Sequence, residues 1–134
     1  MIAGVNHITL AVTDLPRSIW FYTDILGGTL RADWSHGAYL ELGELWLCLT
    51  LSDTPIQSRQ DYTHIALSCK DADFPTLSRQ IRDHAELWQD NKSEGASLYF
   101  RDPDGHQLEL HQGNLASRLA HYRTQVDGQV RVYD

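Results

Sequence analysis

The stretch HITLAV at residues 7–12 decides the fold, because a near copy of it, HIALSC, follows at residues 64–69. The copies begin with His7 and His64, which lie 57 residues apart, and an aspartate follows each copy at the same distance. A repeat with a fixed period indicates one supersecondary unit that occurs twice and packs against its copy. A unit of about 55 residues buries too little of its surface to be stable alone. The two units are therefore expected to share a core, within the chain or between chains.

Each half of the chain predicts a strand, a helix and then three more strands. A helix follows the first strand of each half, with Asp14 or Thr13 as N-cap in the first and Asp71 or Asp73 in the second. Asn114 caps a short added helix over 114–123. Alternating apolar residues predict strands over 5–12, 29–34, 37–42 and 45–51, and again over 61–69, 86–89, 97–101 and 106–111.

These elements predict one α+β domain over residues 1–134. A first βαβββ module spans 1–52 and a second spans 61–112, with a polar linker between them. A C-terminal helix and tail occupy 113–134.

The composition excludes several classes of function. The formal net charge is −7, which disfavours binding to nucleic acid or to an anionic membrane surface. No apolar run reaches the ~20 residues that a membrane-spanning helix needs. The chain has 2 cysteines, too few for a disulfide scaffold, and no signal-like N-terminus. A cytoplasmic location with free thiols is therefore expected.

The two repeat-equivalent histidines point to a metal site. In the last strand of the second half, the period of two places Glu109 on one face with Gln107 and His111. His7, His64 and Glu109 form a set of two imidazoles and one carboxylate, which suits Mn²⁺, Fe²⁺, Zn²⁺, Co²⁺ or Ni²⁺. Such a set leaves coordination positions for water or substrate. His111 is the alternative third ligand.

A structural role is the alternative for each of these residues. A single histidine on a strand is usually packed or hydrogen-bonded, and only the repeat favours ligation here. Trp46 and Tyr39 are equally compatible with core positions, and Cys48 is expected to be an inert buried thiol. The other histidines are expected to face solvent: His36, His84, His106 and His121.

Two βαβββ modules with inward-facing histidines resemble the vicinal oxygen chelate superfamily, whose paired modules curl sheets around a metal cleft. Within it, the chain is similar to the fosfomycin-resistance glutathione transferases of the FosA type over almost its whole length. The DPDGH turn recurs across the superfamily, so this narrower likeness depends on the motifs taken together. They are NHITLAV (6–12), Trp34, GAYL (37–40), LWLCL (45–49), DYTH (61–64), NKSEGASLYF (91–100), DPDGH (102–106) and SRL (117–119).

The resemblance implies a reaction and an assembly. It implies a Mn²⁺-dependent transferase in which the thiol of glutathione opens the epoxide of fosfomycin and so confers antibiotic resistance. It also implies a K⁺ ion beside the substrate. The family forms a homodimer whose modules pair across subunits, so His7 is expected to face His64 and Glu109 of the partner subunit.

The resemblance also implies roles for residues around the metal. The catalytic roles fall to Thr9 and Tyr39, with Tyr39 helping to keep the thiol ionised. The phosphonate of the drug is contacted by Thr9, Trp46, Ser93, Ser97, Tyr99 and Arg118. Potassium is held by Asn91, Ser93, Gly95 and Ser97. Glutathione is bound by Trp34, Tyr39 and Lys92.

Two positions depart from the family pattern. A lysine is common in the family where this chain has Gln89, and Asp90 adds a negative charge beside it. Losing a charge-assisted contact to a phosphonate costs about 1.5–3 kcal/mol, roughly 10–100-fold in affinity, unless Lys92 compensates. His36 replaces the usual glutamine near the glutathione channel.

Other functions stay open, and the fold alone also allows a dioxygenase or a glyoxalase, although their usual fourth-ligand or iron-site patterns are not evident. A fosfomycin epoxide hydrolase carries a glutamate that activates water, but the aligned residue here is Gly37. A transferase can use another thiol, such as bacillithiol or cysteine. A non-catalytic protein that sequesters the drug shares the fold but lacks the metal triad, so His7, His64 and Glu109 argue against it.

Overall fold

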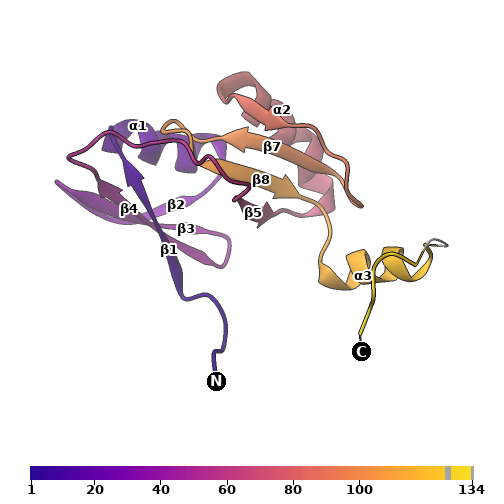
Figure 1. Cartoon of the computed structure of the whole chain (residues 1–134). Coiled ribbons are helices and arrows are strands. Elements are labelled where there is room, and N and C mark those ends of the chain that lie inside the picture. The colour runs from indigo at the N-terminus through magenta and orange to yellow at the C-terminus, as the bar shows by residue number, and fades with distance from the viewer. Residues whose placement is uncertain (126–127, 134) are drawn as a thin grey trace.

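The computed structural model describes residues 1–125 and 128–133, and it contains two four-stranded sheets flanked by helices (Figure 1). The first sheet has the order β1-β4-β3-β2 and is formed by β1 (His7–Val12), β2 (Thr29–Trp34), β3 (Gly37–Leu42) and β4 (Leu45–Leu51). The second has the order β5-β8-β7-β6 and is formed by β5 (Ile65–Ser68), β6 (Leu87–Gln89), β7 (Ser97–Arg101) and β8 (Gln107–His111).

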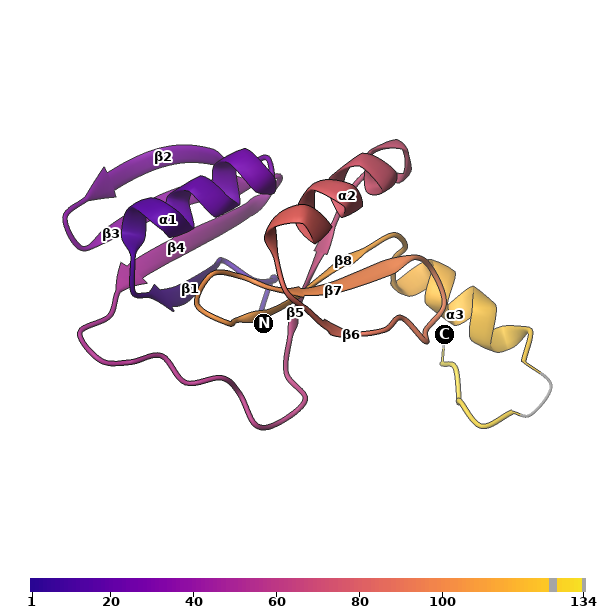
Figure 2. The same ribbon diagram turned by 90° about the horizontal axis from the view of Figure 1, so that it is seen from above.

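Helical segments connect the first two strands of each sheet. In the first half, α1 (Leu15–Trp20) continues into a π-helical turn, η1 (Phe21–Ile25). In the second half, a 3₁₀ turn, η2 (Asp71–Asp73), leads into α2 (Phe74–His84). Each helix lies against the sheet of its own half (Figure 2). A last helix, α3 (Leu115–Arg123), follows the second sheet.

The two sheets have the same topology, which confirms the predicted α+β fold of repeated βαβββ units. In each sheet the first strand pairs in parallel with the last: His7 lies opposite Trp46, and Ala66 lies opposite Glu109. The other pairings are antiparallel. We call residues 7–51 module 1 and residues 61–111 module 2.

Two of the predicted helix caps form as expected. Asp14 accepts a hydrogen bond from the backbone N–H of Arg17 at 3.1 Å. Asn114 and Ser117 form a reciprocal capping box at the start of α3. Asp73 precedes α2 without a side-chain cap bond, so the polar signal there marks the η2 turn instead.

The strand β5 is shorter than the predicted strand over 61–69, because residues 61–63 form a turn. The hydroxyl of Thr63 donates to Oδ1 of Asp61 at 3.1 Å, and its backbone N–H donates to the Asp61 carbonyl. Arg59 donates twice to the same carboxylate, and these bonds, with that from Thr63, lower the pKa of Asp61 to about 2. The turn leaves His64 directly before β5.

The modules share one core, as the repeat predicted. Fully buried side chains come from module 1, including Phe21 and Leu40, and from module 2, including Phe100 and Leu108. The rings of Phe21 and Phe100 lie 6.3 Å apart. Since neither unit alone buries enough apolar surface, this shared core stabilises both within a single chain.

The turn between β7 and β8 is fastened to module 1 by Asp104. Its Oδ1 accepts hydrogen bonds from the backbone and the hydroxyl of Thr13 at 3.1 and 2.5 Å. Its Oδ2 accepts from the buried hydroxyl of Ser18 at 3.3 Å, and Arg17 approaches Oδ1 at 3.3 Å. We call the contact of the 102–106 turn with module 1 the junction.

Asp102 and His106 complete the junction. The hydroxyl of Tyr22 donates to Oδ2 of Asp102 at 2.7 Å. Burial raises the pKa of Asp102, against the opposing effect of the bond from Tyr22. Burial also raises the pKa of Tyr22 well above its usual value, and the charge of Asp102 adds to this. The expectation that His106 faces solvent is wrong, because its Nε2 donates to the carbonyl of Ala11 at 2.7 Å.

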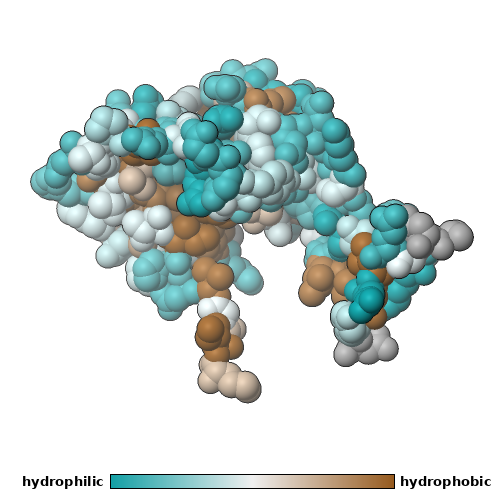
Figure 3. All heavy atoms as spheres, viewed as in Figure 1, coloured by the Kyte–Doolittle hydropathy of each residue, from teal (hydrophilic) through white to brown (hydrophobic). Residues whose placement is uncertain are grey.

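The described residues include no helix long and apolar enough to cross a membrane. Exposed apolar side chains gather along the N-terminal segment and the neighbouring face of the first sheet (Figure 3). The exposed apolar residues of the N-terminal segment include Ile2 and Val5.

Candidate metal and substrate site

Two of the three predicted metal ligands meet at the centre of module 2. Glu109 lies in the middle of β8 and is 5% exposed. His64 directly precedes β5, which pairs with β8, and its Nε2 lies 2.9 Å from Oε1 of Glu109. The pair combines a nitrogen and an oxygen donor without a thiolate, which suits divalent metals such as Mn²⁺, Fe²⁺ or Zn²⁺.

Aromatic side chains surround His64. Its ring centroid lies 5.3 Å from that of Tyr62, 5.7 Å from that of Trp88 and 5.9 Å from that of Tyr99. The indole N–H of Trp88 donates to backbone carbonyls of β7 and β8, at 3.1 and 3.0 Å. Gln89 donates to the hydroxyl of Tyr62 at 2.9 Å. These contacts restrict the orientation of the imidazole.

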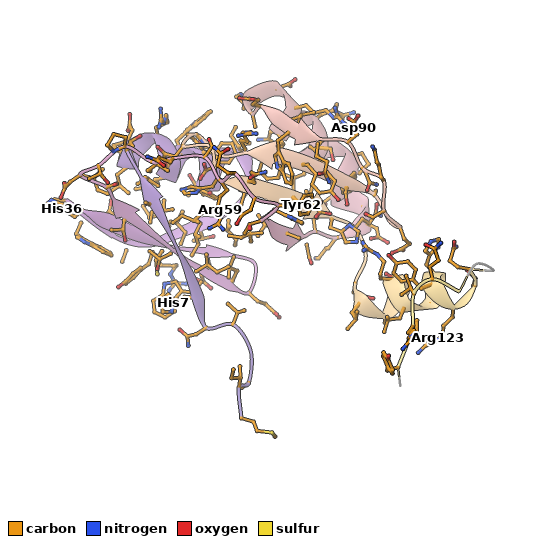
Figure 4. The ribbon with its side chains drawn as sticks, in the orientation of Figure 1. His7, His36, Arg59, Tyr62, Asp90 and Arg123 are labelled. Atoms are coloured by element: carbon orange, nitrogen blue, oxygen red, sulfur yellow. The ribbon has the colours of Figure 1, made fainter. Side chains whose placement is uncertain are left out.

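His7, the third predicted ligand, lies on module 1. Its ring stacks on Trp46 with centroids 4.4 Å apart, and its Nδ1 lies 2.6 Å from Oδ1 of Asn6. Figure 4 shows His7 near the start of β1, away from Tyr62 in module 2. Across residues 1–125 and 128–133, no three His, Cys, Asp or Glu side chains are grouped so as to hold a metal. Within one chain, His64 and Glu109 are therefore in contact, whereas His7 lies apart from them.

A row of aromatic rings continues from His7 across module 1. Ring centroids lie 5.3 Å apart for Trp46 and Tyr39, and 4.9 Å apart for Tyr39 and Trp34. All three side chains are exposed, so the alternative that Trp46 and Tyr39 are core residues is wrong. Thr9 lies on the same face as His7 because alternate residues of a strand point the same way. We call this surface the aromatic face.

The predicted potassium loop is folded by its own side chains. Asn91 donates to the carbonyl of Gly95 at 2.8 Å and accepts from the N–H and hydroxyl of Ser93 at 3.0 and 3.1 Å. Gly95 has a φ of +83°, and a Cβ there would lie 2.5 Å from a backbone oxygen. The neighbouring Lys92 is exposed. The loop therefore presents hydroxyl and carbonyl oxygens close together.

Ser97 and Arg118 connect this loop to its surroundings. The hydroxyl of Ser97 donates to Oε2 of Glu109 at 2.6 Å, so this predicted substrate residue touches the predicted metal carboxylate. Arg118, on α3, donates to Oε2 and to the carbonyl oxygen of Glu94 at 3.2 and 3.3 Å. The sequence gives no sign of the Glu94 contact, because the two residues lie 24 positions apart.

His111, the alternative third ligand, lies beside Glu109, and its ligation stays a prediction. Its Nδ1 lies 2.6 Å from Oγ of Ser97 and 3.3 Å from Oε2 of Glu109, whereas His64 approaches Oε1. The inward position of His111 in β8 follows from the strand period, but its link to Ser97 depends on the pairing of β7 with β8.

Known proteins are similar to this chain over most of its length. Residues 4–110 match the model of the "Glyoxalase/Bleomycin resistance protein/Dioxygenase superfamily". The chain is 50% identical to glutathione transferase FosA of Serratia marcescens, over 90% of this chain and 88% of that protein. It is 37% identical to metallothiol transferase FosB of Staphylococcus haemolyticus, over 92% and 93% of the two chains.

A solved structure extends the comparison. The fosfomycin resistance protein FosX of Listeria monocytogenes, in complex with Mn(II) and sulfate, superposes with a TM-score of 0.79 at 31% identity. The match covers 91% of this chain and 99% of FosX. The chain therefore belongs to the glyoxalase/bleomycin resistance protein/dioxygenase superfamily and, within it, to the FosA-type fosfomycin-resistance proteins.

Proposed function

We propose that this protein is a metal-dependent glutathione transferase that opens the epoxide of fosfomycin by thiol addition and so confers resistance. The observation that carries the proposal is the contact of His64 with buried Glu109, inside an aromatic wall, in a chain half identical to FosA. A drug-sequestering protein has no need of an imidazole and a carboxylate placed together at 2.9 Å. Their nitrogen and oxygen donors fit a divalent cation.

We propose Mn²⁺ as the cation, with His64 and Glu109 as two ligands and His7 of the partner subunit as the third. The support is that FosX was crystallised with Mn(II), and that His7 sits exposed on module 1 rather than beside its own chain's pair. The aromatic face of one subunit would then cover His64 in the other, which gives a homodimer. Bound there, the cation supplies Lewis-acid stabilisation of the oxygen that leaves the epoxide carbon.

The residues next to Glu109 are proposed to bind the phosphonate. Arg118 can bind phosphonate oxygens bidentately once it releases Glu94, and Ser97 and Tyr99 share one face of β7. Ser93 is proposed to add a hydroxyl from the loop before β7. Thr9 and Trp46 of the aromatic face complete the set. Because the protein carries a net charge of −7, these local donors must offset a repulsive overall field. A K⁺ ion held by Asn91, Ser93, Gly95 and Ser97 is proposed to add positive charge.

The thiol is proposed to come from glutathione, held by Trp34, Tyr39 and Lys92. The thiol gives its proton to solvent, the sulfur bonds to the epoxide carbon beside phosphorus as the C–O bond breaks, and the resulting alkoxide takes a proton from solvent. The hydroxyl of Tyr39 donates a hydrogen bond to the thiolate, and Thr9 stabilises the developing oxyanion. The chain's own thiols are poor candidates, because Cys48 is buried and burial, with nearby Asp73 and Asp71, raises the pKa of Cys69. Two free thiols and a reduced co-substrate support a cytoplasmic location.

Hydration of the epoxide is the second candidate, and Gly37 argues against it. A Cβ at this position would lie 2.8 Å from the carbonyl oxygen of Leu49 and 2.6 Å from the indole of Trp34. No glutamate fits there without displacing β4 or the aromatic face. The lower identity to FosB than to FosA supports glutathione over another thiol.

Mass spectrometry of fosfomycin after incubation with the protein, Mn²⁺ and one thiol tests the proposal. We expect a mass gain of one glutathione, no such gain after chelation, and little product with bacillithiol or cysteine. Addition of water identifies a hydrolase, and tight binding without a mass change identifies sequestration. Glu109→Gln and His64→Ala serve as metal-site controls, and the exposed His84→Ala as a matched histidine control.

A further inference from the structure

We propose that His111 is a positioning residue that couples the metal carboxylate Glu109 to the phosphonate-binding Arg118 through a hydrogen-bond chain of fixed direction. The inference rests on the proposed function and adds a residue to it. Ser97 and His111 lie directly opposite each other in the β7–β8 pairing, and Glu109 precedes His111 by two residues on the same face. The three side chains therefore form one cluster.

The direction of the chain follows from what each group can donate. A carboxylate only accepts, so the hydroxyl proton of Ser97 points to Oε2 of Glu109 at 2.6 Å. Ser97 must then accept from Nδ1 of His111, also at 2.6 Å, which places a proton on Nδ1. A guanidinium only donates, so the bare Nε2 accepts from Nη2 of Arg118 at 3.5 Å. The structure thus assigns the Nδ1–H tautomer to His111.

The ring of His111 is also confined by its neighbours. A Cβ on Gly95 would lie 2.9 Å from Cε1 of the ring, and a Cβ on Gly113 would lie 3.1 Å from Nε2. Both glycines have positive φ, at +83° and +136°. Only 13% of the His111 side chain is exposed. The two glycines therefore leave room for the ring, which lies with Nδ1 toward Ser97 and Nε2 toward Arg118 on α3.

The ring of His111 has two proposed roles, one through each nitrogen, and we expect substitutions to affect them separately. Through Nδ1 and Ser97, His111 orients the carboxylate, and losing such an outer partner typically lowers metal affinity by about 10–100-fold. Through Nε2, it restrains Arg118, and losing one hydrogen bond of this kind raises KM for the drug by about 2–10-fold. Asn can replace the Nδ1 donor, and Gln can replace the Nε2 acceptor.

The test compares His111→Asn, His111→Gln and His111→Ala, with His84→Ala as the control. Mn²⁺ affinity is measured by calorimetry, and KM for fosfomycin by steady-state kinetics at saturating Mn²⁺. We expect His111→Asn to keep Mn²⁺ affinity and raise KM, His111→Gln to lose affinity and keep KM, and His111→Ala to lose both. Independently, ¹⁵N NMR of the metal-free wild-type protein should show the proton on Nδ1.

The possible failures are distinguishable. If the wild-type protein forms no glutathione adduct and binds no Mn²⁺, the proposed function and the inference both fall. If the wild-type protein is active but the three variants match it, or share one common defect, only the inference falls. A proton on Nε2 of His111 overturns it whatever the kinetics show.

Discussion

Replacing Asp104 by alanine should strongly destabilise the fold, because this carboxylate fastens module 2 to module 1. Its side chain is 3% exposed and accepts hydrogen bonds from Thr13 and from Ser18, which is fully buried. The pair with Arg17 contributes little, since Arg17 is 44% exposed and solvent screens it to about 0–1 kcal/mol. The larger loss is that of the hydrogen bonds from Thr13 and from the buried hydroxyl of Ser18.

Hydrogen bonds to a charged group contribute about 1.5–3 kcal/mol each, so losing the bonds from Thr13 and Ser18 costs about 3–5 kcal/mol. For a domain of this size, each kcal/mol shifts Tm by about 3–5 °C. We therefore expect Asp104→Ala to lower Tm by about 10–20 °C. Asp104→Asn keeps one accepting oxygen and the shape of the side chain, so its loss should be about 1–2 kcal/mol.

Differential scanning calorimetry measures both variants, with Asp53→Ala on the exposed linker as a matched control. The order of Tm should be control, then asparagine, then alanine. A decrease below about 4 °C for Asp104→Ala would refute the reasoning, since it would mean that the modules are held together by their shared core alone.

Three further predictions concern single positions. Because the pKa of Tyr22 is raised above its unfolded value, the wild-type protein should lose stability as pH rises above about 10. Urea unfolding at pH 8 and pH 11 should show a smaller loss of stability for Tyr22→Phe than for the wild type, and an equal loss would count against this prediction. Gln89→Lys should raise kcat/KM for fosfomycin by roughly 10–100-fold through a charge-assisted contact to the phosphonate, and steady-state kinetics that show an equal or lower value reject this. Gly37→Ala should cost about 1–3 kcal/mol, because its Cβ meets the carbonyl of Leu49 at 2.8 Å; an unaltered urea midpoint would show that β4 yields at no cost.

Most of the fold could be predicted from the sequence repeat. Periodicity and caps such as Asp14 and Asn114 are local signals, so they place strands and helices without knowledge of the tertiary structure. The start of β5 was missed because the turn at 61–63 depends on the particular contacts of Asp61 with Arg59 and Thr63.

The candidate site was predictable in part. The sequence spacing predicted His64 and Glu109 as ligands, and the structure places them in contact. The spacing carries no information on the contact of Arg118 with Glu94 or on the direction of the hydrogen bonds through His111. Such contacts depend on which strands are neighbours and on side-chain geometry. The junction is a similar case: the buried bond between Tyr22 and Asp102 links residues 80 positions apart.

The exposed His7 on module 1 has a consequence for genetics. If each metal centre takes His7 from one subunit and Glu109 from the other, then a homodimer of His7→Ala and a homodimer of Glu109→Ala are both inactive. Each variant lacks a different ligand. A mixed dimer would carry one doubly damaged centre and one intact centre. Two dead alleles expressed together should therefore complement each other and restore growth on the drug.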